Sequence, residues 1–327
     1  MKVTSRLALA LALAVTACNS AASRPQVVDP PPASTTPGAP AGAMQAAATP
    51  AKSKLRVVII SEDGMRPDAL DATTAPNHVA LNHAGMIARR AWTVNPSETL
   101  PSHASMLSGF AVADHKMSFD GFKKERGQIE LPTIFSIARH QGLKTAMFIG
   151  KQKLWHIAPD ASVDHYEKPG FLCHIVAARA AAYYEAELPD LMFVHFTDPD
   201  NAGHAHGWMS PPYIAAVHEA DRCLRTMLDA LDHSGTSATT LLIVTADHGG
   251  SGRSHSGHGK ELDRRIPWTM RGPQIRPGSM VDADIMTEDT AVTALAALNL
   301  PTQTGMVGVS WYPPPANLVH DAPTAAK

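Results

Sequence analysis

The sequence has little net charge, few cysteines and no internal repeat. Its 28 Lys and Arg residues nearly balance 30 Asp and Glu residues, which gives a formal net charge of −2 at pH 7. Without a basic field, the chain shows no nucleic-acid-binding patch. Its 327 residues, 44% of them hydrophobic, are enough for one large domain with a proper core or for two small ones. Histidine, by contrast, is abundant, with 17 residues.

The N-terminus has the pattern of an export signal. Lys2 and Arg6 precede an apolar run over residues 7–17 that is too short to span a bilayer. The run ends in Val-Thr-Ala-Cys18, which resembles the lipobox of bacterial lipoproteins, where the cysteine is lipidated and becomes the mature N-terminus. We therefore expect a lipoprotein-type signal peptide over 1–18, with the chain facing the periplasm or held at the outer membrane by a lipid on Cys18. An ordinary signal peptide with an incidental cysteine is the alternative.

The predicted signal leads into a segment without apolar periodicity. Residues 19–53 are rich in Pro, Ala, Ser and Thr and cannot bury enough surface to offset their ordering entropy, so we expect a disordered tether. One folded domain is then predicted over 54–315, followed by a disordered tail over 316–327. Cys173 and Cys223 remain in that domain. An oxidising periplasm would allow them to pair, but the sequence leaves the disulfide open.

Four apolar runs have the character of buried strands. Residues 55–61 (LRVVIIS) are β-branched and almost wholly apolar, as in a strand covered on both faces. The others are 144–149, 191–196 and 241–245. Segments of helical character lie between the runs, over 131–141, 175–187 and 212–231. This alternation predicts an α/β fold with a mostly parallel central sheet sandwiched between helices.

Three of these strands deliver a carboxylate at the C-terminal end. Asp63, Asp200 and Asp247 each follow such a run, and the last two are accompanied by His204 and His248. Open α/β sheets bind their ligands at these ends. Any one aspartate has the simpler interpretation of a helix cap or an Asx-turn. Three together, with histidines, indicate metal ligands.

The candidate ligands suit zinc. Hydrolytic zinc takes mixed His and Asp ligands and keeps a position open for substrate. The candidates are Asp63, Asp200, His204, Asp247, His248 and one of His255 or His258. Six protein ligands suit two ions better than one. We expect the spacing Asp200-x-x-x-His204 to let one loop bend both groups onto a single ion, with Gly203 and Gly207 supplying backbone freedom.

Thr99 is the candidate nucleophile. It stands just before a helix predicted over 103–108 and closed by Gly109. A helix N-terminus favours an anion, and an adjacent metal would lower the pKa of the hydroxyl enough to activate it. The alternative is that Ser97, Thr99 and Ser102 are ordinary capping residues.

Taken in order, these motifs resemble one superfamily. The set is DGMRPD (Asp63), SETLPSH (Thr99), DPDNAGH (Asp200, His204) and TADHGG (Asp247, His248). It resembles the alkaline phosphatase superfamily, and within it the type I phosphodiesterase/nucleotide pyrophosphatase branch, over about residues 55–315. The resemblance implies an alkaline phosphatase-like fold with a small cap insertion. It also implies in-line attack on phosphorus by the Thr99 alkoxide through a phosphothreonine.

The resemblance divides the ligands between two zinc ions, other divalent metals being possible. It assigns one ion to Asp63, Thr99, Asp247 and His248, and the other to Asp200, His204 and a late histidine. His258, in a His-Gly pair, matches the usual context of that histidine, whereas His255 keeps the better spacing from Asp247. We favour His258.

Two lysines match an element that holds a phosphoryl or sulfuryl group in relatives. Lys151 and Lys153 lie in Gly150-Lys-Gln-Lys after a strand, where their charges would neutralise nonbridging oxygens. A solvated pair at a helix start is the alternative. In one departure from relatives, Asp120 stands where many have an asparagine that donates to a phosphoryl oxygen. An ionised Asp120 would repel the substrate anion.

The sequence therefore predicts a phosphoester hydrolase acting on a small-molecule phosphate ester. A phosphomonoesterase is the serious rival, because two lysines suit a dianionic group. A sulfatase is disfavoured, because the stretch Thr99-Leu-Pro-Ser-His103 lacks the modifiable residue and the arginine of the sulfatase signature. A non-catalytic zinc-binding lipoprotein would have no use for Thr99.

Overall fold

The computed structural model of the protein describes residues 55–256 and 260–322. The predicted signal peptide, the predicted tether and His258 lie outside these ranges. The strands within them are β1 (Arg56–Glu62), β2 (Met86–Trp92), β3 (Thr145–Phe148), β4 (His165–Glu167), β5 (Leu191–Phe196), β6 (Thr240–Thr245), β7 (Trp268–Arg271), β8 (Ser279–Met286) and β9 (Val319–Asp321). The α-helices are α1 (Pro76–Ala84), α2 (Thr99–Ser108), α3 (Val112–His115), α4 (Ile134–His140), α5 (Cys173–Glu187), α6 (Asp198–His206), α7 (Pro211–His233), α8 (Glu261–Arg264) and α9 (Asp289–Ala297).

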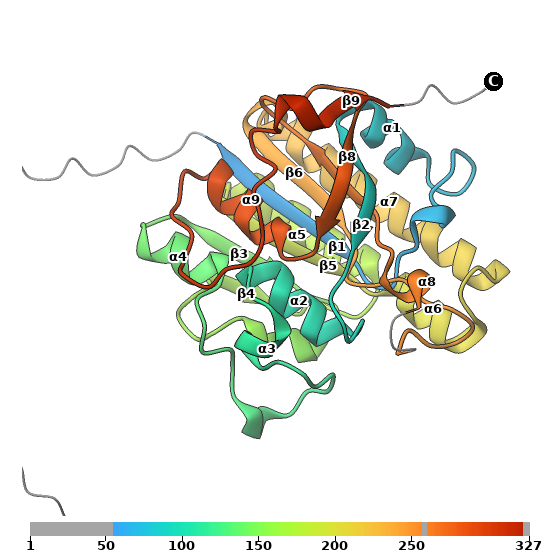
Figure 1. Ribbon diagram of the computed structural model, residues 1–327, viewed down its shortest axis with the longest axis horizontal. Helices are drawn as coiled ribbons and strands as arrows, with labels where there is room; N and C mark the ends of the chain where they lie inside the picture. The colour runs from blue at the N-terminus through green and yellow to red at the C-terminus, as the bar shows by residue number, and fades with distance from the viewer. Residues whose placement is uncertain (1–54, 257–259, 323–327) are drawn as a thin grey trace, which may run out of the picture. The chain divides into compact units, whose positions relative to one another are not determined.

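The described strands form one sheet, in the order β4-β3-β5-β1-β6-β7-β2-β8-β9 (Figure 1). Of the eight neighbouring pairs in this part of the chain, five are parallel and three antiparallel. β1 lies between β5 and β6, so that Val58 faces Met192 on one side and Leu242 on the other. The α/β fold with a mostly parallel sheet is confirmed, and the ends of β1, β5 and β6 reach the same edge.

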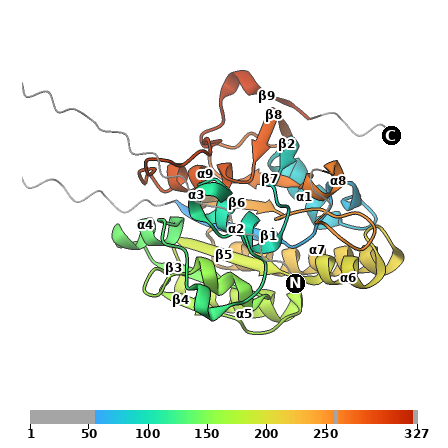
Figure 2. The ribbon, with the colours of Figure 1, turned by 60° about the horizontal axis from the view of Figure 1, so that its bottom comes forward.

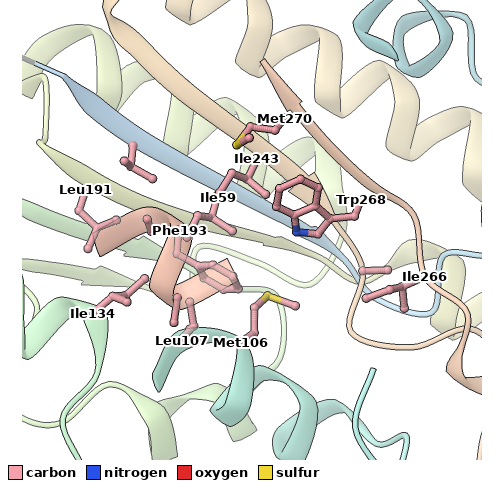
Figure 3. Packing of buried hydrophobic residues seen from close by; sticks show 14 of the residues in the cluster. Ile59, Met106, Leu107, Ile134, Leu191, Phe193, Ile243, Ile266, Trp268 and Met270 are labelled. Carbon is pink, nitrogen blue, oxygen red and sulfur yellow. The ribbon is translucent and has the colours of Figure 1, made fainter. Parts of the chain in front are cut away.

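Helices cover both faces of the sheet (Figures 1 and 2). Successive side chains of a strand point to opposite faces. On one face, Ile59 and Phe193 pack with Met106 of α2 (Figure 3). On the other face, Ile60 packs in a second cluster with Leu224 of α7. Burial of each such side chain contributes roughly 1.5–3 kcal/mol. Since both faces are buried, the central strands are apolar throughout, which is why they read as continuous runs.

A disulfide joins the two helices that cover this second face. Cys173 of α5 and Cys223 of α7 are bonded, with their Cα atoms 6.0 Å apart. Both cysteines are buried in the cluster between these helices and the sheet. The bond joins residues separated by 50 positions, and a cross-link of this kind typically stabilises a domain by about 2–4 kcal/mol. The sequence left open whether Cys173 and Cys223 form a disulfide, and in the structure they do.

The start of α2, the segment 198–206 and the C-terminal tail differ from their predictions. α2 begins at Thr99 rather than at residue 103, because Pro101 is tolerated in the first turn of a helix. The segment 198–206, expected as a loop, is helix α6. The predicted tail from 316 is wrong over 316–322, since β9 pairs antiparallel with β8. A three-residue edge strand is too short to leave a pattern in the sequence. None of the described helices has the length and apolar character that a membrane span needs.

Candidate functional site

The three predicted aspartates meet where β1, β5 and β6 end. The backbone N–H of Asp63 donates to Phe196 O at 2.9 Å, and that of Asp200 donates to Asp63 O at 2.9 Å. The N–H of Gly64 donates to Asp247 Oδ1 at 3.1 Å. Gly64 has φ +71°, and a Cβ there would lie 2.8 Å from Asp200 Cα, so only glycine allows this close approach. The strand ends thus hold all three carboxylates, each at least nine-tenths buried.

Helix α6 places Asp200 and His204 one turn apart on the same face. His204 Nε2 lies 3.4 Å from Asp200 Oδ1. Glycine plays a different part here from the one expected, because a Cβ on Gly203 would lie 2.6 Å from the Trp208 ring. Gly203 therefore permits the ring to pack on the helix instead of bending a loop. Gly207, with φ +97°, ends the helix.

Three imidazoles present the same nitrogen to the carboxylates. The Nδ1–H groups of His204, His248 and His255 donate to backbone carbonyls at 3.0, 2.8 and 2.6 Å. Each ring therefore keeps the lone pair of Nε2 for the site. Anchoring one ring nitrogen on a carbonyl while the other binds metal is the usual arrangement of a histidine ligand. Burial and the neighbouring His248 lower the pKa of His255 to about 4, which keeps it neutral at pH 7.

Four buried polar atoms that could bind a metal have no hydrogen-bond partner among the described residues: Asp63 Oδ1, Asp200 Oδ1, Asp247 Oδ2 and His248 Nε2. His248 Nε2 lies 3.5, 3.9 and 3.4 Å from the other three atoms in that order. Buried polar atoms are nearly always paired, since leaving one unpaired costs about 1–3 kcal/mol. Four that face one region have the chemistry of a cation site, so the residues present fit a metal.

The donor atoms form two overlapping groups, each with all its atoms within 4.8 Å of one another: Asp63, Asp200 and His248, and Asp200, His204 and His255. Asp200 belongs to both groups, whereas the sequence placed it with one ion. His255 Nε2 lies 3.9 Å from Asp200 Oδ1, within the region where we expected a different late histidine. His258, the residue favoured from the sequence, lies outside the described residues.

The carboxyl groups of Asp63 and Asp247 have pKa values shifted in opposite directions. Burial opposes ionisation of Asp63, but the adjacent Lys151, His195 and His248 hold the pKa of its carboxyl well below the ordinary value. Burial and the neighbouring Asp63 carboxylate raise the pKa of Asp247 well above its ordinary value. Carboxylates this close cannot all ionise without additional positive charge. That repulsion is a second reason why the site favours a divalent cation.

Thr99 is the first residue of α2 and is almost fully buried. The N-cap position belongs to Glu98, whose side chain makes no capping bond, so Thr99 does not cap this helix. Lys151 Nζ lies 3.4 Å from Thr99 Oγ1 and also contacts Asp63 Oδ2 at 2.7 Å and Asp200 Oδ2 at 2.6 Å. The hydroxyl, the lysine and both carboxylates therefore share one site.

Lys153 and Asp120 complete this side. Lys153 Nζ lies 2.7 Å from Asp120 Oδ2, and Asp120 Oδ1 accepts the backbone N–H of Leu100 at 2.9 Å. Asp120, the residue that departs from the relatives, therefore lies directly beside the start of α2. Lys151 and Lys153 both contact carboxylates, so they are not the solvated pair of the alternative interpretation.

Two histidines of the site were missed from the sequence. His195 donates from Nε2 to Asp63 Oδ2 at 2.9 Å and accepts from Gly150 N at 3.4 Å. His103 donates from Nδ1 to Thr99 O at 2.7 Å and accepts from Ser61 Oγ at 2.8 Å. Both are fully buried, and they orient the groups that face the site. The signal available for His195 was a single histidine within an otherwise apolar strand.

Curated relatives share this part of the chain. The human ectonucleotide pyrophosphatase/phosphodiesterase family member 7 is 23% identical over 220 residues, which cover 60% of this chain and 48% of the relative. The venom phosphodiesterase of Naja atra is 24% identical over 219 residues, covering 59% and 26%. The chain thus spans about half or less of the length of these two relatives.

Solved structures share the fold. An inactive variant of the murine ectonucleotide pyrophosphatase/phosphodiesterase 5, in complex with AMP, has a TM-score of 0.68 at 14% identity and covers 81% of this chain and 100% of its own. The phosphonate monoester hydrolase of Silicibacter pomeroyi has a TM-score of 0.61 at 18% identity, covering 84% and 78%. At such identities the likeness establishes the fold.

The family assignment rests on the sequence itself. Residues 57–267, well over half of the 327, match the family described as type I phosphodiesterase / nucleotide pyrophosphatase. The matched range contains Thr99, Lys151 and the described metal-ligand candidates, so the resemblance drawn from four short motifs is confirmed. The chain belongs to the type I phosphodiesterase / nucleotide pyrophosphatase family, within the alkaline phosphatase superfamily.

Proposed function

We propose that the protein is a metal-dependent hydrolase of phosphate esters, of the phosphodiesterase/nucleotide pyrophosphatase type, with Thr99 as its nucleophile. The observation that carries the proposal is the position of the Thr99 hydroxyl. It lies at the start of a helix and beside Lys151, whose ammonium also contacts Asp63 and Asp200. A metal-holding protein without catalysis would have no reason to bury a hydroxyl there.

Two zinc ions would be held by Asp63, Thr99, Asp247 and His248, and by Asp200, His204 and a late histidine. Zinc supplies Lewis acidity that favours the ionised hydroxyl and stabilises negative charge on phosphoryl oxygens. Asp200, which belongs to both groups of potential ligand atoms, would link the two sets. Other divalent metals also bind oxygen and nitrogen donors of these kinds, so zinc itself is part of the proposal.

The chain's own residues carry the covalent steps. Thr99 Oγ forms a bond to phosphorus as the bond from phosphorus to the leaving oxygen breaks, and the leaving oxygen takes up a proton. Water then attacks the phosphothreonine, which restores the hydroxyl and releases the phosphate product. Lys151 contacts the hydroxyl and would neutralise a nonbridging oxygen during both steps. The N-terminus of α2 favours the same negative charge.

The relatives support a nucleotide substrate. The relatives are named as nucleotide pyrophosphatases or phosphodiesterases, and one structural neighbour was solved in complex with AMP. We expect the zinc-loaded protein to hydrolyse an aryl phosphodiester and a dinucleotide. Turnover should be measured side by side on these two, an aryl monoester and an aryl sulfate. Preferential hydrolysis of the sulfate, or no turnover of any ester, would overturn the proposal.

The identity of the late histidine is a separate prediction. Since His255 lies with Asp200 and His204, we expect zinc in His255→Ala to fall from about two toward one per chain. Its matched control is His258→Ala, which removes an imidazole from the same loop and should keep about two. Zinc content after dialysis at a fixed free zinc concentration decides between them. The opposite pattern would assign the ligand to His258.

We also propose that the protein is exported and anchored by a lipid on Cys18, at the periplasmic side of the cell envelope. The Cys173–Cys223 disulfide supports an oxidising compartment. A Cys18→Ser variant should move from the membrane fraction to the soluble fraction after cell lysis. Equal distribution of the variant and the wild type would contradict the anchor.

A further inference from the structure

The Asp120 carboxylate accepts from two hydrogen-bond donors that lie beside the proposed nucleophile, Thr99. Its Oδ1 accepts the N–H of Leu100 at 2.9 Å, and its Oδ2 lies 2.7 Å from Lys153 Nζ. Leu100 directly follows Thr99 at the start of α2. The side chains of Asp120 and Lys153 are 26% and 17% exposed, so the pair lies at the border between the buried site and solvent.

These two donors are of the kind that a phosphoryl oxygen would use. A backbone N–H at a helix N-terminus and a lysine ammonium both favour negative charge. In this protein the chain supplies a carboxylate to both. Lys151, which would neutralise one nonbridging oxygen, also lies between Asp63 and Asp200, so it offers no charge for a second one. On the side of the site formed by Leu100 and Lys153, Asp120 already neutralises the lysine charge that an additional anionic oxygen would use.

This balance distinguishes two classes of phosphate ester. A phosphodiester carries one negative charge, whereas a phosphomonoester carries up to two once its second pKa of about 6 is passed. A second negative charge that took the Leu100 N–H or the Lys153 ammonium as its partner would lie beside the Asp120 carboxylate, and adjacent like charges repel strongly when partly buried.

We propose that Asp120 is a specificity-determining residue, whose carboxylate makes this site prefer monoanionic phosphodiesters over dianionic monoesters. The inference rests on the proposed function and adds the substrate class and the residue that selects it. A purely structural role for Asp120, as an acceptor for Leu100 N–H, is the competing interpretation.

Asp120→Asn separates these two roles. Asparagine has nearly the same shape and retains an oxygen that accepts the Leu100 N–H, but it removes the negative charge. The measured quantity is kcat/KM for an aryl phosphodiester divided by kcat/KM for the matching aryl monoester, about two pH units above the second pKa of the monoester (~6). We expect this ratio to fall at least tenfold in Asp120→Asn, chiefly because the monoester is hydrolysed faster.

Glu125→Gln is the matched control. Glu125 is exposed on the same segment, so the variant removes one negative charge without touching α2. Its diester-to-monoester ratio should stay within about twofold of the wild type. Inhibition of diester hydrolysis by inorganic phosphate gives a second readout that needs no monoester turnover. The inhibition constant should fall roughly tenfold in Asp120→Asn, since bound phosphate is also largely dianionic.

The outcomes are distinguishable. A wild-type protein that hydrolyses neither ester would overturn the proposed function and this inference with it. A wild-type protein that hydrolyses the diester, with both the ratio and the phosphate inhibition unchanged in a folded Asp120→Asn variant, would overturn the inference alone. An equal change in Glu125→Gln would also overturn it, because the effect would then be one of general surface charge.

Discussion

Replacing Thr99 by alanine is expected to lower kcat/KM for a phosphodiester by about a thousandfold or more, because a methyl group cannot form the bond to phosphorus. Zinc content should stay near two per chain, since the first ion keeps Asp63, Asp247 and His248 of its four proposed ligands and the ligands of the second ion are unchanged. Steady-state kinetics on the zinc-loaded variant, together with metal analysis of the same sample, measures both quantities.

Thr99→Ser is the matched control for this substitution. The serine keeps the hydroxyl and loses one methyl group, so kcat/KM should remain within about tenfold of the wild type. Near-normal turnover in Thr99→Ala would contradict the assignment. It would mean that water attacks phosphorus directly and that the hydroxyl is only a part of the α2 start.

Removing the metal is expected to abolish turnover and to destabilise the fold. Chelation would leave the Asp63 and Asp247 carboxyl groups close together without a cation between them. The four buried polar atoms that have no hydrogen-bond partner among the described residues would then lose their ligand as well. A tightly bound ion adds about 4 kcal/mol at a thousand times its Kd, so we expect the melting temperature to fall by roughly 10 °C. Differential scanning calorimetry with and without chelator measures this shift, and added zinc should restore both stability and activity.

Asp200→Asn and His204→Ala sharpen this test. Asp200 belongs to both donor groups, whereas His204 belongs to one. Zinc should therefore fall below one per chain in Asp200→Asn and only toward one in His204→Ala. Equal zinc contents in the two variants would show that Asp200 serves a single ion. An unchanged melting temperature after chelation would show that the donor cluster is not a metal site.

The central part of the fold was predictable because its strands are buried on both faces. β1, β5 and β6 read as continuous apolar runs, and each run is followed by a carboxylate. β2 and β8 were missed for the opposite reason. β8, for instance, has exposed residues such as Asp282 and Asp284 within it, so its pattern is mixed and offers no continuous run.

The site was predictable where Asp and His residues, the types that bind metals, directly follow a predicted strand. Asp63, Asp200, Asp247 and His248 were found from their places after strands, and the structure brings them together. Contacts between distant segments were not predictable. His195 supports Asp63 from the neighbouring strand β5, 132 residues along the chain. Spacing along the chain holds no information on such pairs, because folding alone makes them neighbours.

Trapping phosphate on the nucleophile tests the central claim most directly. A slowly hydrolysed diester with labelled phosphorus would be mixed with zinc-loaded protein and quenched in acid, and the labelled peptide would be identified by mass spectrometry. The proposed mechanism predicts stable label on the peptide that contains Thr99, and none in Thr99→Ala. Turnover of the diester with no label on any peptide, or label on another residue, would contradict it.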